Sequence, residues 1–271
     1  ARALTTKQIE ALTTSHVANL ETQDIAAMAP VQLSKMTTAH IADGITSAQI
    51  EALSTTQIVA LTTAQVNALT TENLAAMNTA QIRALTAAQI KALNSDQISN
   101  MATDDFAALS SSQIAAMSTT QIAFLSSDQI ANLSTLQIKG LTAAQIGKLD
   151  TTQIANIETT DLEQMSTAQI AALITEHVAN LNDDQVIALT TAQAKALTSS
   201  QIAALTTSQL QQLETVDLAA MSATQISKLT TQQVKEGLTT DHIAALTTVQ
   251  IAAMTTAQVE SLTTDSLVAL S

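Results

Sequence analysis

Four histidines have the widest chemical range of any side chains in this chain, because an imidazole can bind a metal ion or transfer a proton. They are His16, His40, His177 and His242, and there is no cysteine to join them in a metal site. Each lies at a position of a short repeat where glutamine is usual, and only the first two are near each other in sequence. This placement favours a glutamine-like polar or capping role. No metal site and no cofactor is predicted.

Acidic pairs are the second candidate for ligand binding, and Asp104-Asp105 and Asp183-Asp184 could bind calcium weakly. Neither pair has the glycine-rich spacing of an EF-hand loop or of a calcium-binding β-roll, and solvated helix N-termini explain them more simply. Serine and threonine are abundant, but their regular recurrence indicates helix caps, and no histidine–acid pair accompanies any one of them. No catalytic residue is predicted, and the chain is not expected to be an enzyme.

The composition excludes several other classes of protein. Hydrophobic residues make up 46% of the 271 residues, which is too apolar for a disordered tail. The formal charge of −13 argues against nucleic acid or a polybasic membrane patch as a partner. Polar residues interrupt every apolar run, so no insertion into a membrane is predicted.

The elements that position these side chains come from an eight-residue repeat, such as residues 61–68, whose positions we number as slots one to eight from Leu61 to Ala68. Thr62 is expected to be the N-cap of a helix and to accept a hydrogen bond from the N–H of Gln65. The Gln65 side chain can return a bond to the N–H of Thr62, which closes a capping box. Leu61 and Val66 have the spacing of a hydrophobic staple. Each octad therefore contains the start of one helix.

The repeat runs from Leu4 to Leu270 as 33 units, so residues 1–271 are predicted to be a single continuous repeat array. Two units have nine residues and end at Gly44 and Gly237, where we expect glycine in a left-handed conformation at a helix end. Slot two is Thr, Ser, Asn or Asp in 27 units, and slot five is Gln in 23. Three units carry Glu in slot two and Asp in slot five, and there the cap is expected to shift by one residue: Glu21 with Asp24, Glu158 with Asp161, and Glu214 with Asp217.

The fold predicted from this pattern is an all-α solenoid of very short capped helices, one per octad. Apolar slots one and six recur with a mean spacing of four residues, which fits neither one long helix nor a coiled coil. A β-solenoid is the alternative, although alanine and glutamine are poor strand formers. All eight methionines lie in slot one, which predicts core positions in place of leucine. The pattern leaves open whether two or three helices form one turn.

Octads such as Leu141-Thr142-Ala143-Ala144-Gln145-Ile146 resemble the LTTxQIxA repeat tracts of very large secreted or surface proteins of Gram-negative bacteria. The resemblance covers essentially the full chain. It implies an extracellular or cell-surface location and a structural role as stalk, spacer or fibre, and it supplies no catalytic residues.

The function expected from these observations is the body of an extracellular bacterial fibre, filament or adhesin stalk. Neither end of the array shows an atypical polar capping repeat, so self-association end to end, as a homopolymer or within a longer array, is expected. The alternative is a surface-binding solenoid that recognises polysaccharide, protein or ice through its regular threonine and serine stripe. Clustered exposed aromatic side chains would favour carbohydrate, and the sequence lacks them.

Overall fold

A computed structural model describes residues 2–270 and divides the chain into two compact units, unit 1 (Ala1–Gly140) and unit 2 (Leu141–Ser271). Every regular element among the described residues is a helix of four to six residues. The prediction of short helices, one per octad, is therefore confirmed over residues 2–270, and the β-solenoid alternative is wrong. Within the same range, no helix has the length and apolar character that crossing a membrane requires.

The elements of unit 1 are short helices, most of them separated by two or three extended or turn residues. They are α1 (Thr6–Glu10), α2 (Thr14–Ala18), α3 (Thr22–Ala26), α4 (Pro30–Leu33), η1 (His40–Gly44), α5 (Ser47–Glu51), α6 (Thr55–Ala60), α7 (Thr63–Ala68), α8 (Thr71–Ala75), α9 (Thr79–Ala84), α10 (Ala87–Ala92), α11 (Ser95–Ser99), α12 (Thr103–Ala107), α13 (Ser111–Ala116), α14 (Thr119–Ala123), α15 (Ser127–Ala131) and α16 (Thr135–Gly140).

Unit 2 repeats the same local pattern. Its elements are α17 (Ala143–Ile146), α18 (Thr151–Ala155), α19 (Thr159–Leu162), α20 (Thr167–Ala171), α21 (Thr175–Ala179), α22 (Asp183–Ile187), α23 (Thr191–Ala196), α24 (Ser199–Ala204), α25 (Thr207–Gln212), α26 (Thr215–Ala220), α27 (Ala223–Ile226), η2 (Gln233–Gly237), α28 (Thr240–Ala245), α29 (Thr248–Ala252), α30 (Thr256–Glu260) and α31 (Thr264–Ala269).

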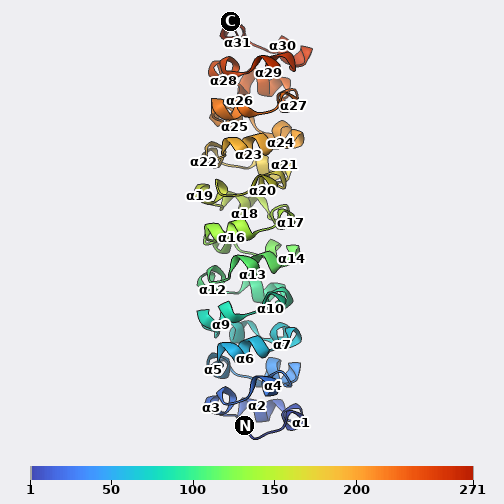
Figure 1. The fold of residues 1–271 in the computed structure, drawn as a ribbon, viewed down its shortest axis with the longest axis vertical. Helices are drawn as coiled ribbons and strands as arrows, with labels where there is room; N and C mark the ends of the chain where they lie inside the picture. Colours follow the sequence, from blue (N-terminus) through green and yellow to red (C-terminus); the bar gives the residue numbers. More distant parts are fainter. Residues whose placement is uncertain (1, 271) are drawn as a thin grey trace. The chain divides into compact units, whose positions relative to one another are not determined.

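Three helices form one turn of the solenoid within each unit, which answers the question that the sequence left open. In unit 1, α10 packs against both α7 and α13, and α13 packs against α16. In unit 2, α23 packs in the same way against α20 and α26. Figure 1 shows these helices stacked one above another inside their own unit. We call three consecutive octads a coil, so each helix lies on the equivalent helix of the preceding coil.

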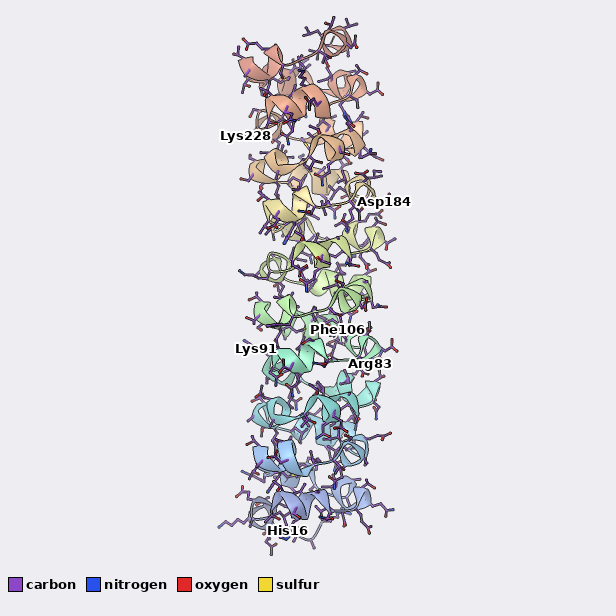
Figure 2. The ribbon with its side chains drawn as sticks, turned by 180° about the vertical axis from the view of Figure 1, so that it is seen from behind. His16, Arg83, Lys91, Phe106, Asp184 and Lys228 are labelled. Carbon is purple, nitrogen blue, oxygen red and sulfur yellow. The ribbon has the colours of Figure 1, made fainter. Side chains whose placement is uncertain are left out.

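The core of each unit is formed by slots one and six, because their side chains point inward from all three helices of a coil. Ile58 in slot six is fully buried, and Leu61 in slot one is 3% exposed. Phe106, labelled in Figure 2, takes slot six in α12 and is also fully buried. All eight methionines are buried in slot one, so their predicted core role is confirmed.

The two nine-residue units form π-helices, η1 and η2, whose closing bonds run from Ile45 N–H to the His40 carbonyl (2.7 Å) and from Leu238 N–H to the Gln233 carbonyl (3.1 Å). The expectation that each insertion lies at a helix end is confirmed. The expectation of left-handed glycine is wrong, since no described residue has a positive φ.

Glycine is present at the π-helices because the preceding coil approaches its Cα closely. A Cβ on Gly44 would lie 3.0 Å from the Thr14 carbonyl oxygen and 3.2 Å from Val17 Cβ. At Gly237 the nearest atom would be Leu210 Cδ1, also at 3.0 Å. The constraint is therefore space between coils rather than backbone conformation.

The expected shift of the cap in the three Glu–Asp units is also wrong. Glu21, Glu158 and Glu214 remain the N-cap residues of α3, α19 and α26, each with extended backbone. None of the three side chains accepts a capping hydrogen bond. The helix keeps its start because the buried slot-six residue fixes its phase, and a later start would rotate that residue away from the core.

Candidate functional site

The most constrained polar position of the chain is slot five, and Gln65 shows what it does. Its Oε1 accepts a hydrogen bond from the N–H of Thr62 (2.7 Å), and its own N–H donates to the Thr62 hydroxyl (3.2 Å). This is the capping box that the sequence predicts. The Nε2 group of the same side chain donates to two carbonyls of the preceding coil, those of Leu33 (2.8 Å) and Met36 (2.7 Å).

The bonds between coils recur with a fixed spacing. Gln89 Nε2 donates to the Ile58 and Leu61 carbonyls (both 2.8 Å), which lie 31 and 28 residues earlier. In unit 2, Gln201 Nε2 donates to the Ile170 and Leu173 carbonyls at 2.8 and 2.7 Å. These acceptors lie at or just after helix C-termini, where carbonyls are short of partners. The slot-six carbonyls also accept a local bond, such as that from the Leu61 N–H to the Ile58 carbonyl (3.2 Å). One glutamine therefore caps the start of its own helix and the end of a helix in the preceding coil. We call this set of bonds the glutamine ladder.

The nine-residue units leave the ladder intact. Gln49, which follows Gly44, donates through Nε2 to the Val17 and Leu20 carbonyls, 32 and 29 residues earlier. These are the same slots as elsewhere, reached across one additional residue. The π-helices thus absorb the insertion without changing which slots are paired.

The four histidines occupy the same box in place of glutamine, as the sequence predicts. His40, His177 and His242 accept a backbone N–H at Nδ1 and contact a carbonyl of the preceding coil through Nε2 at 2.7 to 2.8 Å. Because Nδ1 accepts, the Nε2–H tautomer fits these bonds. His16 has only the Nδ1 bond to the N–H of Thr13 (3.2 Å), and it is exposed in the first coil of unit 1 (Figure 2).

The fold alters the titration of His177. Burial lowers the pKa of His177, while the hydrogen bond to the Leu149 carbonyl and the charges of Glu176 and Asp150 act in the opposite direction. Protonation would place a hydrogen on Nδ1, which faces the N–H of Ile174 at 3.3 Å. The neutral ring is therefore the form that can make both hydrogen bonds, to the Ile174 N–H and to the Leu149 carbonyl.

The aspartates of slot five do not reproduce the glutamine pattern. In α12 and α26, Asp105 and Asp217 leave the helix start without a capping box. Burial, followed by the charge of Asp104, raises the pKa of Asp105. Burial also raises the pKa of Asp217, assisted by the charge of Glu214 and opposed by a hydrogen bond from the Thr191 side chain.

The acidic pairs considered as calcium ligands lie in the first turns of α12 and α22. Asp183 and Asp184 are exposed, and Asp184 lies at the outer surface in Figure 2. Over residues 2–270 no group of three or more His, Asp or Glu side chains is close enough to hold a metal ion.

Shallow surface hollows follow the grooves between coils. One, of about 550 Å³, lies in unit 1 beside Arg83, whose Nε donates to the Ala108 carbonyl of the next coil (3.3 Å). Another, of about 230 Å³, lies between Lys91 and the half-exposed ring of Phe124. Small and neutral side chains line most of both hollows, and no arrangement of nucleophile, base and acid is present in either.

These features define an all-α repeat protein whose slot-five side chains join successive coils. The ALTTAQ repeat profile matches residues 43–71, 71–103, 98–135, 154–191, 210–248 and 243–271, which together make up more than half of the chain. The chain belongs to the ALTTAQ repeat family.

Other comparisons add little to this assignment. No curated protein matches the chain significantly. Among solved structures, the leucine-rich repeat-containing protein LegL7 from Legionella pneumophila is similar at 9% identity, with 90% of this chain and 79% of that chain covered and a TM-score of 0.22. Because this TM-score is too low to indicate a shared fold, the comparison supports no inference.

The second function of the slot-five glutamine was missed at the level of sequence, although a signal for it exists. A capping box is satisfied by Glu as well as by Gln. Slot five nevertheless contains no Glu in any of the 33 octads. Glutamate has no donor for the carbonyls of the preceding coil, whereas glutamine and neutral histidine each have one.

Proposed function

We propose that this chain is the repetitive body of an extracellular bacterial fibre, filament or adhesin stalk. The observation that carries the proposal is the glutamine ladder, because within each unit one set of bonds joins successive coils. Such a structure can be lengthened coil by coil while every internal contact stays the same. Length is the property that a stalk or fibre requires.

The proposed role is structural rather than catalytic, and two features support it. The slot-two hydroxyls, such as that of Thr62, already accept backbone N–H groups in capping boxes. The two hollows described above are lined mostly by neutral side chains. The same use of the slot-two hydroxyls weakens the alternative of a stripe that binds polysaccharide, protein or ice. In each pair of neighbouring threonines, one of the two hydroxyls is already used in capping.

An extracellular or cell-surface location is part of the proposal and draws on the resemblance to secreted octapeptide tracts. The test is immunogold labelling, with antibodies raised against unit 2, of the cells that produce the protein. Gold along surface filaments or stalks is the expected result. Gold confined to the cell interior would refute the proposed location and, with it, the fibre.

Self-association end to end is the proposed mode of assembly. The last slot-six side chains, Val259 and Leu267, are 45% and 50% exposed, whereas Val234 in the same slot of the preceding coil is fully buried. In the first coil, Gln8 and His16 make capping bonds within their own helices.

Sedimentation velocity over a range of protein concentrations tests this assembly. The expected result is species of increasing size with concentration, which Leu267→Lys reduces. The matched control is Leu136→Lys, since Leu136 is 73% exposed on the side of unit 1 and lies outside both end surfaces. A chain that stays monomeric at all concentrations, or two variants that behave alike, would refute end-to-end association.

A further inference from the structure

The glutamine ladder has gaps at which an acid replaces the amide. Asp105 in unit 1 and Asp217 in unit 2 occupy slot five, and Asp217 is 2% exposed. The spacing of 28 and 31 residues that Gln209 shows assigns the Leu189 and Val186 carbonyls to Asp217. An ionised carboxylate only accepts hydrogen bonds, so it cannot bond these carbonyls.

A side chain of aspartate length can reach the preceding coil from slot five. Asn73 occupies this slot in α8, and its Nδ2 donates to the Ile45 carbonyl, 28 residues earlier, at 3.1 Å. Its Oδ1 accepts from the Ser47 hydroxyl at 3.1 Å. Asp217 already accepts a bond from Thr191, the slot-three residue of the preceding coil, as Asn73 does from Ser47. Protonation of Asp217 would supply the missing donor.

We propose that protonation of Asp105 and Asp217 strengthens the contact of each with the preceding coil, and we call each such contact a joint. While the carboxylate is ionised, it makes no hydrogen bond to the slot-one carbonyl of the preceding coil. When it is protonated, its O–H donates to that carbonyl. For Asp217 this acceptor is the carbonyl of Leu189, and for Asp105 it is the carbonyl of Met77, each 28 residues earlier. The proposal concerns joints inside one unit and does not depend on the proposed function.

The charges around each acid come from its own helix and from the helices packed on either side. Helix α26 packs against α23, which carries Lys195, and against α28, which carries Asp241 and His242. On its own helix, Asp217 has Glu214 at the N-cap. The N-cap charge and burial raise the pKa of Asp217.

Around Asp105 the corresponding groups are Asp104 on the same helix, Arg83 on α9 and Asp128 on α15. Burial and Asp104 raise the pKa of Asp105. A carboxyl whose folded pKa is raised contributes stability that is complete below the unfolded pKa and is lost as pH rises through the folded pKa. Both joints should therefore strengthen as pH falls toward the unfolded pKa of about 4.

The test compares thermal unfolding of the whole chain and of Asp217→Asn, followed by far-ultraviolet circular dichroism between about pH 4 and pH 7. The asparagine amide provides the donor at every pH. We expect Asp217→Asn to melt about 3 °C above the unmodified chain near neutral pH, which is the shift for one net hydrogen bond in a unit of this size. The difference should shrink toward zero at the acid end.

Two further measurements make the outcome decisive. Asp217→Ala removes both the charge and the donor, so it should lose the acid-dependent gain that the unmodified chain shows. Asp183→Asn is the matched control, because it removes one exposed acid from unit 2 and should leave the pH profile parallel to that of the unmodified chain. Parallel profiles for Asp217→Asn and the unmodified chain, or an unchanged acid-dependent gain in Asp217→Ala, would overturn the proposal.

Discussion

Replacing a single slot-five glutamine by methionine should weaken a whole unit, and Gln201→Met is the clearest case. Methionine has nearly the same length and shape but cannot make the hydrogen bonds. Two backbone groups lose their partner, the N–H of Thr198 (2.6 Å) and the Leu173 carbonyl (2.7 Å). The Ile170 carbonyl loses the bond from Gln201 (2.8 Å) but keeps the one from the Leu173 N–H (3.2 Å). Gln201 is 2% exposed, so water cannot easily replace these bonds.

The magnitude follows from the cost of leaving buried polar groups unpaired, about 1–3 kcal/mol each. With one buried carbonyl and one partly buried N–H left unpaired, we expect the free energy of unfolding to fall by about 2–5 kcal/mol. Unfolding entropy is about 2.1 cal/mol/K per residue, so for unit 2 this corresponds to a melting temperature lower by roughly 7–18 °C.

Thermal and urea unfolding, measured by far-ultraviolet circular dichroism, provide the assay. Gln201→His is the first control; it keeps the capping bond and one carbonyl bond, as His177 does, so it should lose only about 1 kcal/mol at neutral pH. Gln212→Met is the second, because Gln212 is exposed and its replacement should change stability by less than about 0.5 kcal/mol. If Gln201→Met is as stable as Gln212→Met, the ladder does not hold the coils together.

Three further predictions concern individual positions. Burial lowers the pKa of His177, so the stability that its neutral ring contributes is complete above the unfolded pKa of about 6.5 and is lost as pH falls through the folded pKa. His177→Gln should remove this loss of stability in acid, as measured by urea unfolding at a series of pH values. Equal slopes of unfolding free energy against pH in both proteins would contradict the prediction. Gly140→Ala should destabilise unit 1 by about 1–3 kcal/mol despite the better helix propensity of alanine, since its Cβ would lie 2.8 Å from the Ser111 carbonyl oxygen; a higher melting temperature would show that the coils can separate freely. Ile174 is an N-cap without a side-chain bond and is 44% exposed, so Ile174→Thr should raise the free energy of unfolding by about 1 kcal/mol, and no gain would mean that the cap position is already satisfied.

Local structure could be predicted from the sequence because the interactions that form each helix lie within a single octad. Thr62 and Gln65 lie three residues apart and form a capping box that depends on no distant group. The slot-six Ile and slot-one Leu were assigned to the core for the same reason, since their spacing alone places them on one side. These local assignments are confirmed within both units.

Contacts between coils could not be predicted in the same way. The partners of Gln65 Nε2 lie 29 and 32 residues earlier, and finding them requires the number of helices in a coil. That number depends on the angles between helices, which no single octad encodes. The prediction of a left-handed conformation at Gly44 was wrong for a related reason. Glycine is required there because Thr14 of another coil lies close to it, whereas its own backbone conformation is one that any residue can adopt.

The reach of the ladder has a consequence for how such a chain acquires its structure. Glutamine bonds between coils span 28 to 32 residues, and each donor reaches back to a carbonyl that precedes it. Each coil can therefore be completed when only the next few helices have left a ribosome or a secretion pore. Because no contact of this kind requires distant segments to meet, the relative contact order falls as coils are added, and low contact order is associated with fast folding. A growing array can mature in the direction of synthesis, one coil at a time.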